Sequence, residues 1–425
     1  MINKIKALSN NIKVRQATGL YAANMISIPL MILTSIVLTR ILGAEDYGNY
    51  SFIRNILNFA SIIFTFGFFQ AGNRALVLNS DEVKRKEYYG SELLVLIVLF
   101  VIMGLCLLLY GLLDNNIAEK GVKGIILLLI PFSWVFLLVK YFETLFPADN
   151  KINLLSLSRI LPKIVFLILV VVVYFIQESI NKNVLLLLWL LNIVAFISTY
   201  IFIIFKIKIS FKRVNERIKE ILQYNKQFGL HVYTGSLFAV GLNALTGVLI
   251  SYFSISNAGV GYYGLAISIT SPLAFIPNVI ATTHYKDFSK RTKISKKILL
   301  ITLLFSLSAF VAILVLVGPF IHIFYGEEFN SVIPLTMTVS IGVLLYGFAD
   351  IFNRFLGANG QGINLRNSSI INGLIIFIFN IALIPRMGET GAGITKIITG
   401  IAYLSVMLFY YLKYINKRKD EKYGV

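Results

Sequence analysis

Long apolar stretches separated by short polar connections run through this chain, and they constrain its fold more than any other feature. Only 14% of the 425 residues are charged, whereas a soluble globular domain carries about 25%. A helix that crosses the hydrocarbon core needs about 20 apolar residues, and many of the stretches have about that length. The sequence therefore predicts an all-α integral membrane protein that crosses the bilayer many times.

Twelve such stretches can be separated, and we expect each to form a transmembrane helix because a lipid-exposed backbone must satisfy its own hydrogen bonds. The stretches are continuous, unlike the short alternating segments of a strand barrel. The expected spans are residues 17–39, 50–72, 91–113, 122–145, 153–176, 184–205, 230–253, 262–283, 297–319, 331–350, 367–385 and 391–412.

The charges of the connections alternate from one side of these spans to the other. The N-terminus, the tail and the even-numbered connections hold 29 Lys and Arg, whereas the opposite side holds five and the spans hold five. Cytoplasmic loops are enriched in Lys and Arg, so we expect both termini to lie on the cytoplasmic side of the membrane. These clusters account for the net charge of +19, and no nucleic-acid partner is expected.

The two halves of the chain each contain six of the expected spans. We expect an N-terminal six-helix lobe over 1–205, a cytoplasmic linker over 206–229, and a C-terminal six-helix lobe with a basic tail over 230–425. Apolar residues recur at helical spacing within 211–224, which favours an amphipathic helix on the membrane surface. A solvated linker without a helix is the alternative.

A weak internal repeat relates the two halves. The matching pairs, at offsets of 213 and 210 residues, are Gly48 with Gly261, Tyr50 with Tyr263, and Asp149 with Asn359. Both members of each pair fall on the same side of the membrane, which indicates parallel repeats related by a pseudo-two-fold axis along the membrane normal. This arrangement is typical of transporters and predicts a central cavity between the lobes.

Ionisable side chains at membrane depth are costly and usually face an internal cavity. Arg159 and Lys163 share one helix face because they are four residues apart, and Lys140 shares a face with Glu143. Alternatively, Lys140 and Glu143 form a structural ion pair, and Arg40 extends to the membrane interface. The excess of cations predicts a cavity for an anionic head group such as pyrophosphate. The residues that we assign to it are Arg40, Arg54, Lys140, Arg159, Lys163 and Lys396.

Two carboxylates are candidates for binding a coupling proton or sodium ion. They are Glu143 and Asp350, and Asp350 can equally pair with Arg354 four residues later. Helix breakers mark candidate hinges, because proline removes a helical hydrogen bond and glycine weakens a helix. The candidates are Pro29 in the first span and Gly235, Gly241 and Gly247 in the seventh, where close helix packing is the alternative.

Motifs for soluble catalytic chemistry are missing from the sequence. It contains no phosphate-binding loop, zinc motif or nucleophile elbow, so we expect no enzymatic activity, cofactor or metal. The single cysteine, Cys106, and three scattered histidines have no ligand spacing. An ATP-driven pump would need a partner subunit to supply its nucleotide site.

The most specific pattern follows the first expected span. It reads Arg40-Ile41-Leu42-Gly43-Ala44-Glu45-Asp46-Tyr47-Gly48, and Phe66-Gly67-Phe68 and Arg74 follow. In this pattern, in its length and in Ser158, Arg159 and Lys163, the chain resembles the polysaccharide biosynthesis flippases. These are the Wzx-type translocases of O-antigen and capsule repeat units, within the multidrug/oligosaccharidyl-lipid/polysaccharide exporter superfamily.

The resemblance implies a substrate and a mechanism. The substrate would be an undecaprenyl-pyrophosphate-linked oligosaccharide, moved from the cytoplasmic to the outer leaflet by ion-coupled alternating access. Arg40, Arg54, Arg159 and Lys163 would bind its pyrophosphate or acidic sugars, and a polysaccharide polymerase and a chain-length regulator would be partners besides the membrane lipids. Two other functions stay open: a drug/cation antiporter of the same fold, which would prefer an acidic cavity, and a membrane-embedded glycosyltransferase or polymerase, which usually needs longer outer loops.

Overall fold

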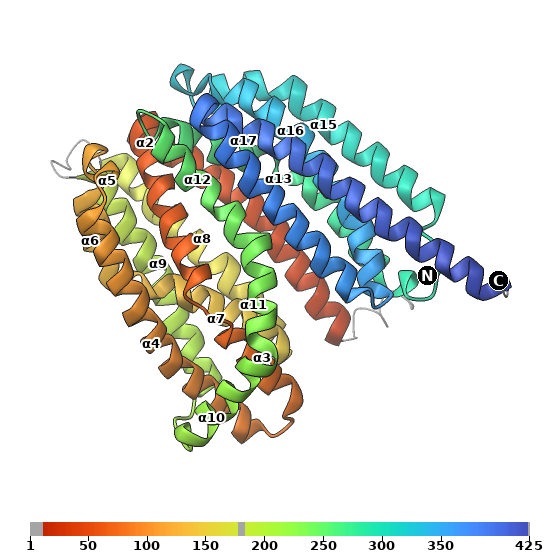
Figure 1. Ribbon diagram of the computed structural model, residues 1–425. Helices are drawn as coiled ribbons and strands as arrows, with labels where there is room; N and C mark the ends of the chain where they lie inside the picture. The colour runs from red at the N-terminus through yellow and green to blue at the C-terminus, as the bar shows by residue number, and fades with distance from the viewer. Residues whose placement is uncertain (1–11, 177–182, 424–425) are drawn as a thin grey trace. The chain divides into compact units, whose positions relative to one another are not determined.

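The computed structural model describes residues 12–176 and 183–423 as a series of helices (Figure 1). The first are α2 (Ile12–Ile63), α3 (Phe68–Leu78), α4 (Glu82–Leu113), α5 (Asn116–Glu119), α6 (Lys123–Leu129), η1 (Ile130–Phe132), α7 (Trp134–Ala148), α8 (Ile152–Ile176), α9 (Val184–Ile207) and α10 (Val214–Tyr224). Those that follow are η3 (Asn225–Gly229), α11 (Leu230–Ser236), η4 (Leu237–Gly241), α12 (Leu242–Phe253), α13 (Ala258–Thr283), α14 (Tyr285–Phe288), α15 (Lys296–Phe324), η5 (Glu327–Phe329), α16 (Val332–Ala358) and α17 (Gly362–Tyr423).

Many of these helices can cross a membrane, which confirms the prediction of a multi-pass helical membrane protein. Among the described residues, eight helices are long and apolar enough, or nine if the bent pair Lys123–Phe132 and Trp134–Ala148 counts as one span. Two of the eight are 42 and 57 residues long, and each covers two of the expected spans. The number of twelve spans remains a prediction.

Glycines interrupt both of the longest helices between the expected spans. Gly43 in α2 has φ 70° and ψ −176°, and Gly388 in α17 has φ 55° and ψ −134°. Positive φ is strained for other residues, so glycine permits a sharp change of direction there. Residues 44–50, expected in a connection, are already helical because the chain resumes its helix directly after Gly43.

Three expected spans are not continuous α-helices. The second, expected over 50–72, is interrupted by the turn at residues 64–67 between α2 and α3. The fourth, expected over 122–145, changes at Ile130–Phe132 to a 3₁₀-helix and bends by 49°. Pro131 lies in this segment and lacks the N–H that a continuing α-helix requires. The seventh, expected over 230–253, contains the π-helical segment Leu237–Gly241 between α11 and α12. The expectation of uninterrupted helices was wrong at all three places.

Contacts divide the chain into two compact units. The first comprises Met1–Leu42 and Ile53–Leu237, and the second comprises Gly43–Phe52 and Phe238–Val425. The short segment Gly43–Phe52, which directly follows the glycine break, therefore belongs to the second unit although it lies early in the sequence.

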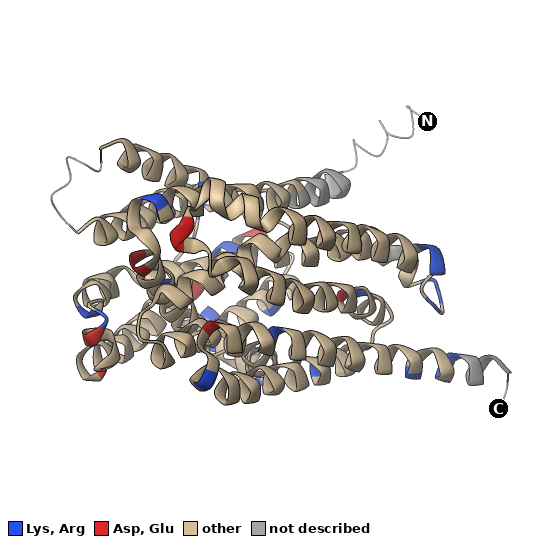
Figure 2. Cartoon of the chain, turned by 90° about the horizontal axis from the view of Figure 1, so that it is seen from above, with Lys and Arg blue, Asp and Glu red and all other residues tan. Residues whose placement is uncertain are grey.

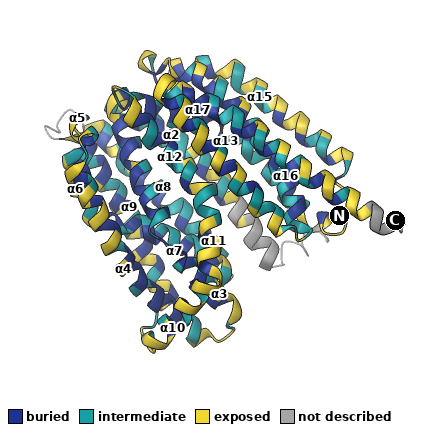
Figure 3. Cartoon of the chain, viewed as in Figure 1, coloured by how far each residue is buried: buried dark blue, intermediate teal, exposed yellow. Residues whose placement is uncertain are grey.

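An aromatic cluster forms the core of the first unit. The ring of Phe142 on α7 lies 4.9 Å from that of Tyr141, 4.7 Å from Phe146 and 5.2 Å from Tyr200 on α9, between centroids. Outward-facing leucines of α4, such as Leu105 and Leu109, are instead exposed (Figure 3). Charged residues are sparse along the helices (Figure 2). Exposed apolar surface with few charges is what a lipid-facing surface requires.

The second unit packs α16 against α13 and α17. Its core includes Phe288, Phe352, Phe355 and Tyr411, all nearly or fully buried. Gly342 on α16 lies so close to the backbone of α17 that a Cβ atom there would overlap a carbonyl group. Small residues permit such close approach of two helices, which is common among membrane-spanning helices.

The helix expected within 211–224 is present as α10, which packs on α3 and α4 in the first unit (Figure 1). Its buried Arg217 forms ion pairs with Glu87 (Nε–Oε2 3.0 Å) and Glu220 (Nη1–Oε1 2.5 Å). Burial alone would lower the pKa of Arg217, but hydrogen bonds with these carboxylates and with Tyr88 raise it above its usual value. Arg217 therefore stays charged and fixes α10 to the unit.

Candidate functional site

A group of charged side chains from three helices forms the strongest candidate site in the first unit. We call Arg54, Lys140, Glu143, Arg159 and Lys163 the cation cluster. Glu143 on α7 lies 3.6 Å from the Lys140 ammonium and 4.0 Å from Arg159 Nε on α8. The ion pair of Lys140 with Glu143 is therefore present, and Glu143 also joins α7 to α8.

The other members of the cation cluster extend it to α2. Lys163 lies within electrostatic range of Arg54, Arg159 and Glu143. Asn24 Oδ1 on α2 accepts a hydrogen bond of 3.1 Å from Arg159 Nη1. Sequence analysis missed Asn24, because an uncharged side chain in an apolar run gives no sign of a partner on a distant helix.

The cation cluster remains accessible although its residues lie within apolar helices. Arg54 is exposed, and the side chains of Lys140, Glu143 and Arg159 are 29–36% exposed. Charges at membrane depth usually face water or a ligand rather than lipid. With four cations and one carboxylate, the cluster can bind an anion, and the planar guanidinium groups suit bidentate contacts with phosphate oxygens.

Arg40, which we also assigned to the expected cavity, lies in the first unit's part of α2 and is exposed three residues before the Gly43 break. The pattern that follows it has structural contacts within the second unit. Glu328 Oε1 accepts a hydrogen bond of 2.9 Å from the Ala44 amide, and the ring of Tyr47 packs edge-on against Phe329. This part of the pattern therefore fixes the segment Gly43–Phe52.

Two glycines matched by the internal repeat meet in the second unit. A Cβ atom on Gly261 would lie 3.1 Å from Gly48 N, so the two helix starts are in direct contact. Asn257 Nδ2 donates a hydrogen bond of 2.8 Å to Asn49 Oδ1 beside this contact. The glycines at these positions are therefore explained by close backbone approach.

The Phe66-Gly67-Phe68 motif forms the turn between α2 and α3. Gly67 has φ 80°, and Phe66 also has a positive φ of 42°. The Phe66 carbonyl accepts a hydrogen bond of 3.2 Å from Asn225 Nδ2, and Tyr233 OH donates one of 2.6 Å to the Ile63 carbonyl. The motif therefore joins this turn to η3 and α11, and no member of it belongs to the cation cluster.

Lys396 occupies a different environment in the second unit. Its ammonium lies 5.2 Å from the ring centroid of Tyr346 and lines a pocket of about 10 Å³. Asn380 and Thr246 also line this pocket, and Asn380 Nδ2 donates a hydrogen bond of 2.8 Å to Thr246 Oγ1. A space of this size holds about one water molecule and no head group. The other polar lining residues are Asn243, Thr395 and Thr399.

Asp350, the second candidate for ion coupling, forms the expected pair with Arg354. The distance from Arg354 Nε to Asp350 Oδ2 is 3.7 Å, and Asn278 Nδ2 on α13 donates a hydrogen bond of 2.6 Å to the same oxygen. This carboxylate therefore joins α13 to α16. Glu143 and Asp350 are both engaged by cations, and their coupling roles remain predictions.

The candidate hinges differ in their local geometry. Pro29 lies inside α2, whose non-helical dihedrals are instead at Gly43. Gly241 ends the π-helical segment of the seventh span, and π-helical turns often mark functional irregularities. A Cβ atom on Gly235 would meet nothing within 4 Å, so close packing does not explain this glycine. Gly247 is buried in α12. Their action as hinges remains a prediction.

One buried carboxylate escaped the sequence analysis. Glu92 on α4 is fully buried, and it packs so closely on Gly72 of α3 that a Cβ atom there would overlap the carboxylate. Glu92 lies at the start of an apolar run, where a charged residue is usually found at the membrane interface. Only the packing of α3 on α4 places it in the interior.

Two of the comparisons with known sequences point to polysaccharide biosynthesis. A model described as polysaccharide biosynthesis protein matches residues 14–285. The chain is 22% identical over 419 residues to the capsular polysaccharide biosynthesis protein CapF of Staphylococcus aureus, covering 94% of this chain and 98% of that protein. It is 24% identical over 315 residues to an uncharacterized membrane protein of Methanocaldococcus jannaschii, covering 70% of this chain and 61% of that protein.

Solved structures extend the comparison to the fold. The lipid II flippase MurJ in an inward closed conformation has a TM-score of 0.68 at 16% identity, covering 94% of this chain and 89% of its own. A multidrug resistance MATE family transporter in an inward-facing conformation has a TM-score of 0.65 at 15% identity, covering 92% and 96%. At such low identity, these likenesses concern the fold alone.

Proposed function

The chain belongs to the polysaccharide biosynthesis protein family, and from this premise we propose that it is a flippase for a lipid-linked oligosaccharide. Its substrate would be an undecaprenyl-pyrophosphate-linked repeat unit for a surface polysaccharide such as O-antigen or capsule. The unit would move from the cytoplasmic to the outer leaflet of a bacterial cell membrane, with both termini of the chain on the cytoplasmic side.

The observation that carries this proposal is the cation cluster. Its four cations outnumber the single carboxylate Glu143, and the side chains of Lys140 and Arg159 remain about one-third exposed. A pyrophosphate group needs several converging donors, and ammonium and guanidinium groups supply them. The oligosaccharide would follow the pyrophosphate through a water-filled path, since sugars are as poorly soluble in hydrocarbon as other polar groups.

Alternating access would move the substrate, with Pro29 and the π-helical segment at Gly241 as the hinges. A proton or sodium ion bound at Glu143 or Asp350 would couple the cycle to an ion gradient. Glu143 is the stronger candidate, because it touches two cations of the cluster, and its protonation would change their charge balance. A polysaccharide polymerase and a chain-length regulator would receive the translocated unit.

A drug/cation antiporter is the second function to consider, because a MATE transporter shares the fold. The charge of the cluster argues against it. An organic cation would be repelled by Arg54, Lys140, Arg159 and Lys163, and like-charge contacts strongly disfavour a ligand. A membrane-embedded glycosyltransferase or polymerase has no catalytic constellation in the described residues to support it.

Reconstitution in vesicles tests the proposal. Purified protein is inserted into vesicles that carry a fluorescent undecaprenyl-pyrophosphate oligosaccharide, and an added glycosidase or quencher reports the fraction in the outer leaflet. We expect translocation under a proton or sodium gradient. Failure to translocate under either gradient, together with uptake of a cationic dye, would favour the antiporter.

A further inference from the structure

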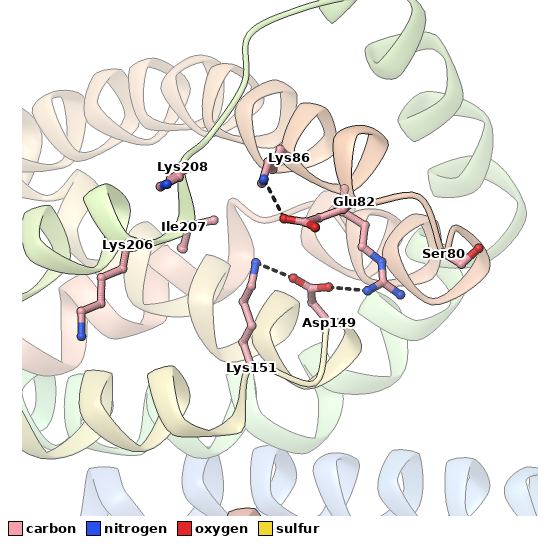
Figure 4. Close-up of a pocket in the computed structure, with 9 residues that line it drawn as sticks. Ser80, Glu82, Lys86, Asp149, Lys151, Lys206, Ile207 and Lys208 are labelled. Atoms are coloured by element: carbon pink, nitrogen blue, oxygen red, sulfur yellow. Dashed lines mark ion pairs between the residues drawn. The ribbon is translucent and has the colours of Figure 1, made fainter. Parts of the chain in front are cut away.

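A basic pocket lies where α4 and α8 begin and α9 ends in the first unit, apart from the cation cluster (Figure 4). We call it the α9 pocket, and its volume is about 620 Å³. Three separate segments contribute cations to it, so it is not a product of one charged loop. These cations are Arg85, Lys86, Lys151, Lys206 and Lys208.

Two carboxylates hold three of these cations in place. Asp149, whose side chain is 5% exposed, forms ion pairs with Arg85 (3.0 Å) and Lys151 (2.5 Å). Glu82 pairs with Lys86 at 2.7 Å. The Asp149 interactions join α4 to the connection between α7 and α8, so ion pairs fix the side chains on this side of the pocket.

The remaining two cations form no ion pair with any residue that the structure describes. Lys206 and Lys208 stand at the end of α9, outside the ion pairs drawn in Figure 4. Lys208 is in the left-handed conformation (φ 54°), which ends the helix there. The Lys206 ammonium lies 4.7 Å from the centroid of the Phe202 ring. The pocket therefore keeps an excess positive charge.

The position of this charge points to the ligand. The candidate spans Ile152–Ile176 and Val184–Ile207 begin and end at the pocket, so it lies at the boundary between apolar and aqueous surroundings. Lipid phosphates occupy this depth, and basic pockets between helix ends bind phosphate head groups. We infer that the α9 pocket binds a phosphate group, from either a lipid head group or a soluble phosphate compound, separately from the transported substrate.

The second unit contains a related pocket, which argues against a chance accumulation of basic residues. Lys413, Lys417 and Arg418 at the end of α17 line a pocket of about 480 Å³ with Asn359. Asn359 is the residue that the internal repeat matches to Asp149. Its Oδ1 accepts a hydrogen bond of 2.8 Å from Tyr414 OH. Cations after the last apolar helix thus recur beside equivalent connections in both units.

Binding measurements on the full chain test the inference. The probes are phosphatidylglycerol and inorganic pyrophosphate, titrated separately into protein in non-ionic detergent. All variants carry K413Q and K417Q, so that the second pocket contributes little. The test variant adds K206Q and K208Q, and the matched control adds K212Q and K219Q, which remove the same charge from exposed positions outside the pocket.

We expect the test variant to lose about 30-fold in affinity, since each of the two Lys near the membrane surface contributes about 1 kcal/mol to anionic-lipid binding. The control should lose less than about twofold, and K206R with K208R should restore binding. Saturable binding of phosphatidylglycerol without competition by pyrophosphate assigns the site to lipid. Pyrophosphate binding with the same dependence assigns it to soluble phosphate. Equal losses in both variants, or no saturation with either probe, would overturn the inference and leave the translocation assay unaffected.

Discussion

Charged residues inside apolar helices have different surroundings in the two units. In the first, Arg159 and Lys163 belong to a cluster from three helices, in which the side chains of Lys140, Glu143 and Arg159 are about one-third exposed. In the second, Lys396 faces Tyr346 in a pocket of about 10 Å³. The first arrangement leaves donors for a ligand, whereas the second places a cation against an aromatic ring in a space too small for a head group. From this difference we propose that anion binding resides in the first unit and that Lys396 mainly stabilises the second.

The largest effect is expected from removing two cations of the cluster. In the variant R159Q/K163Q, translocation of the lipid-linked oligosaccharide should fall by about 100-fold or more, because two charge-assisted contacts of about 1.5–3 kcal/mol each are lost. The measurement is the vesicle assay, with surface polysaccharide in cells as a second readout at unchanged protein level.

The matched control for this double variant is K212Q/K219Q, which removes two positive charges from exposed positions outside the cluster. It should translocate at nearly the normal rate. Normal surface polysaccharide in R159Q/K163Q would break the comparison, because the open cations would then have no role in binding the substrate.

A smaller effect is expected at Lys396, and on a different quantity. K396M should lower the free energy of unfolding by about 0.5–2 kcal/mol, because the contact of the ammonium with the Tyr346 ring is lost. The thermal midpoint in detergent should fall by several degrees, at about 2–4 °C per kcal/mol. Affinity for the substrate should stay within about twofold of normal, since the pocket has no room for a head group.

The control for K396M is K413M, an exposed lysine near the end of the same helix. That variant should change the thermal midpoint little. If K396M instead lost substrate affinity at an unchanged midpoint, Lys396 would serve the ligand, and the contrast between the units would disappear.

Local sequence patterns predicted much of the fold. Apolar length placed most spans, and the four-residue spacing of Arg159 and Lys163 on α8 placed them in one group. Patterns of this kind succeed because burial and helical periodicity depend on neighbours in sequence. The interruption at Ile130–Phe132 was missed although Pro131 was visible, because apolar length was given more weight than the missing N–H.

Contacts between distant segments could not be read from the sequence. The 4.0 Å approach of Arg159 to Glu143 joins two helices, and so does the hydrogen bond to Asn24. The pattern after Arg40 was used only as a sign of the family, and the sequence did not show that Ala44 and Tyr47 contact Glu328 and Phe329 in the second unit. Such pairs depend on how helices pack, and an isolated glycine or tyrosine does not indicate its partner.

The smallest effect is expected from replacing Glu143, the one carboxylate of the cation cluster. E143Q should bind a pyrophosphate-linked lipid about two- to fivefold more tightly, because Lys140 and Arg159 lose a partly exposed ion pair that competes with the ligand. The substitution keeps the size of the side chain, and titration of the purified variant measures the affinity. D350N, at a carboxylate paired in the second unit, is the control and should leave this affinity unchanged.

If Glu143 also carries the coupling ion, then translocation by E143Q will no longer respond to the gradient despite tighter binding. Weaker binding by E143Q would show that the carboxylate positions the cations for the substrate, and the cluster would then act as a fixed network and not as an excess of open charge.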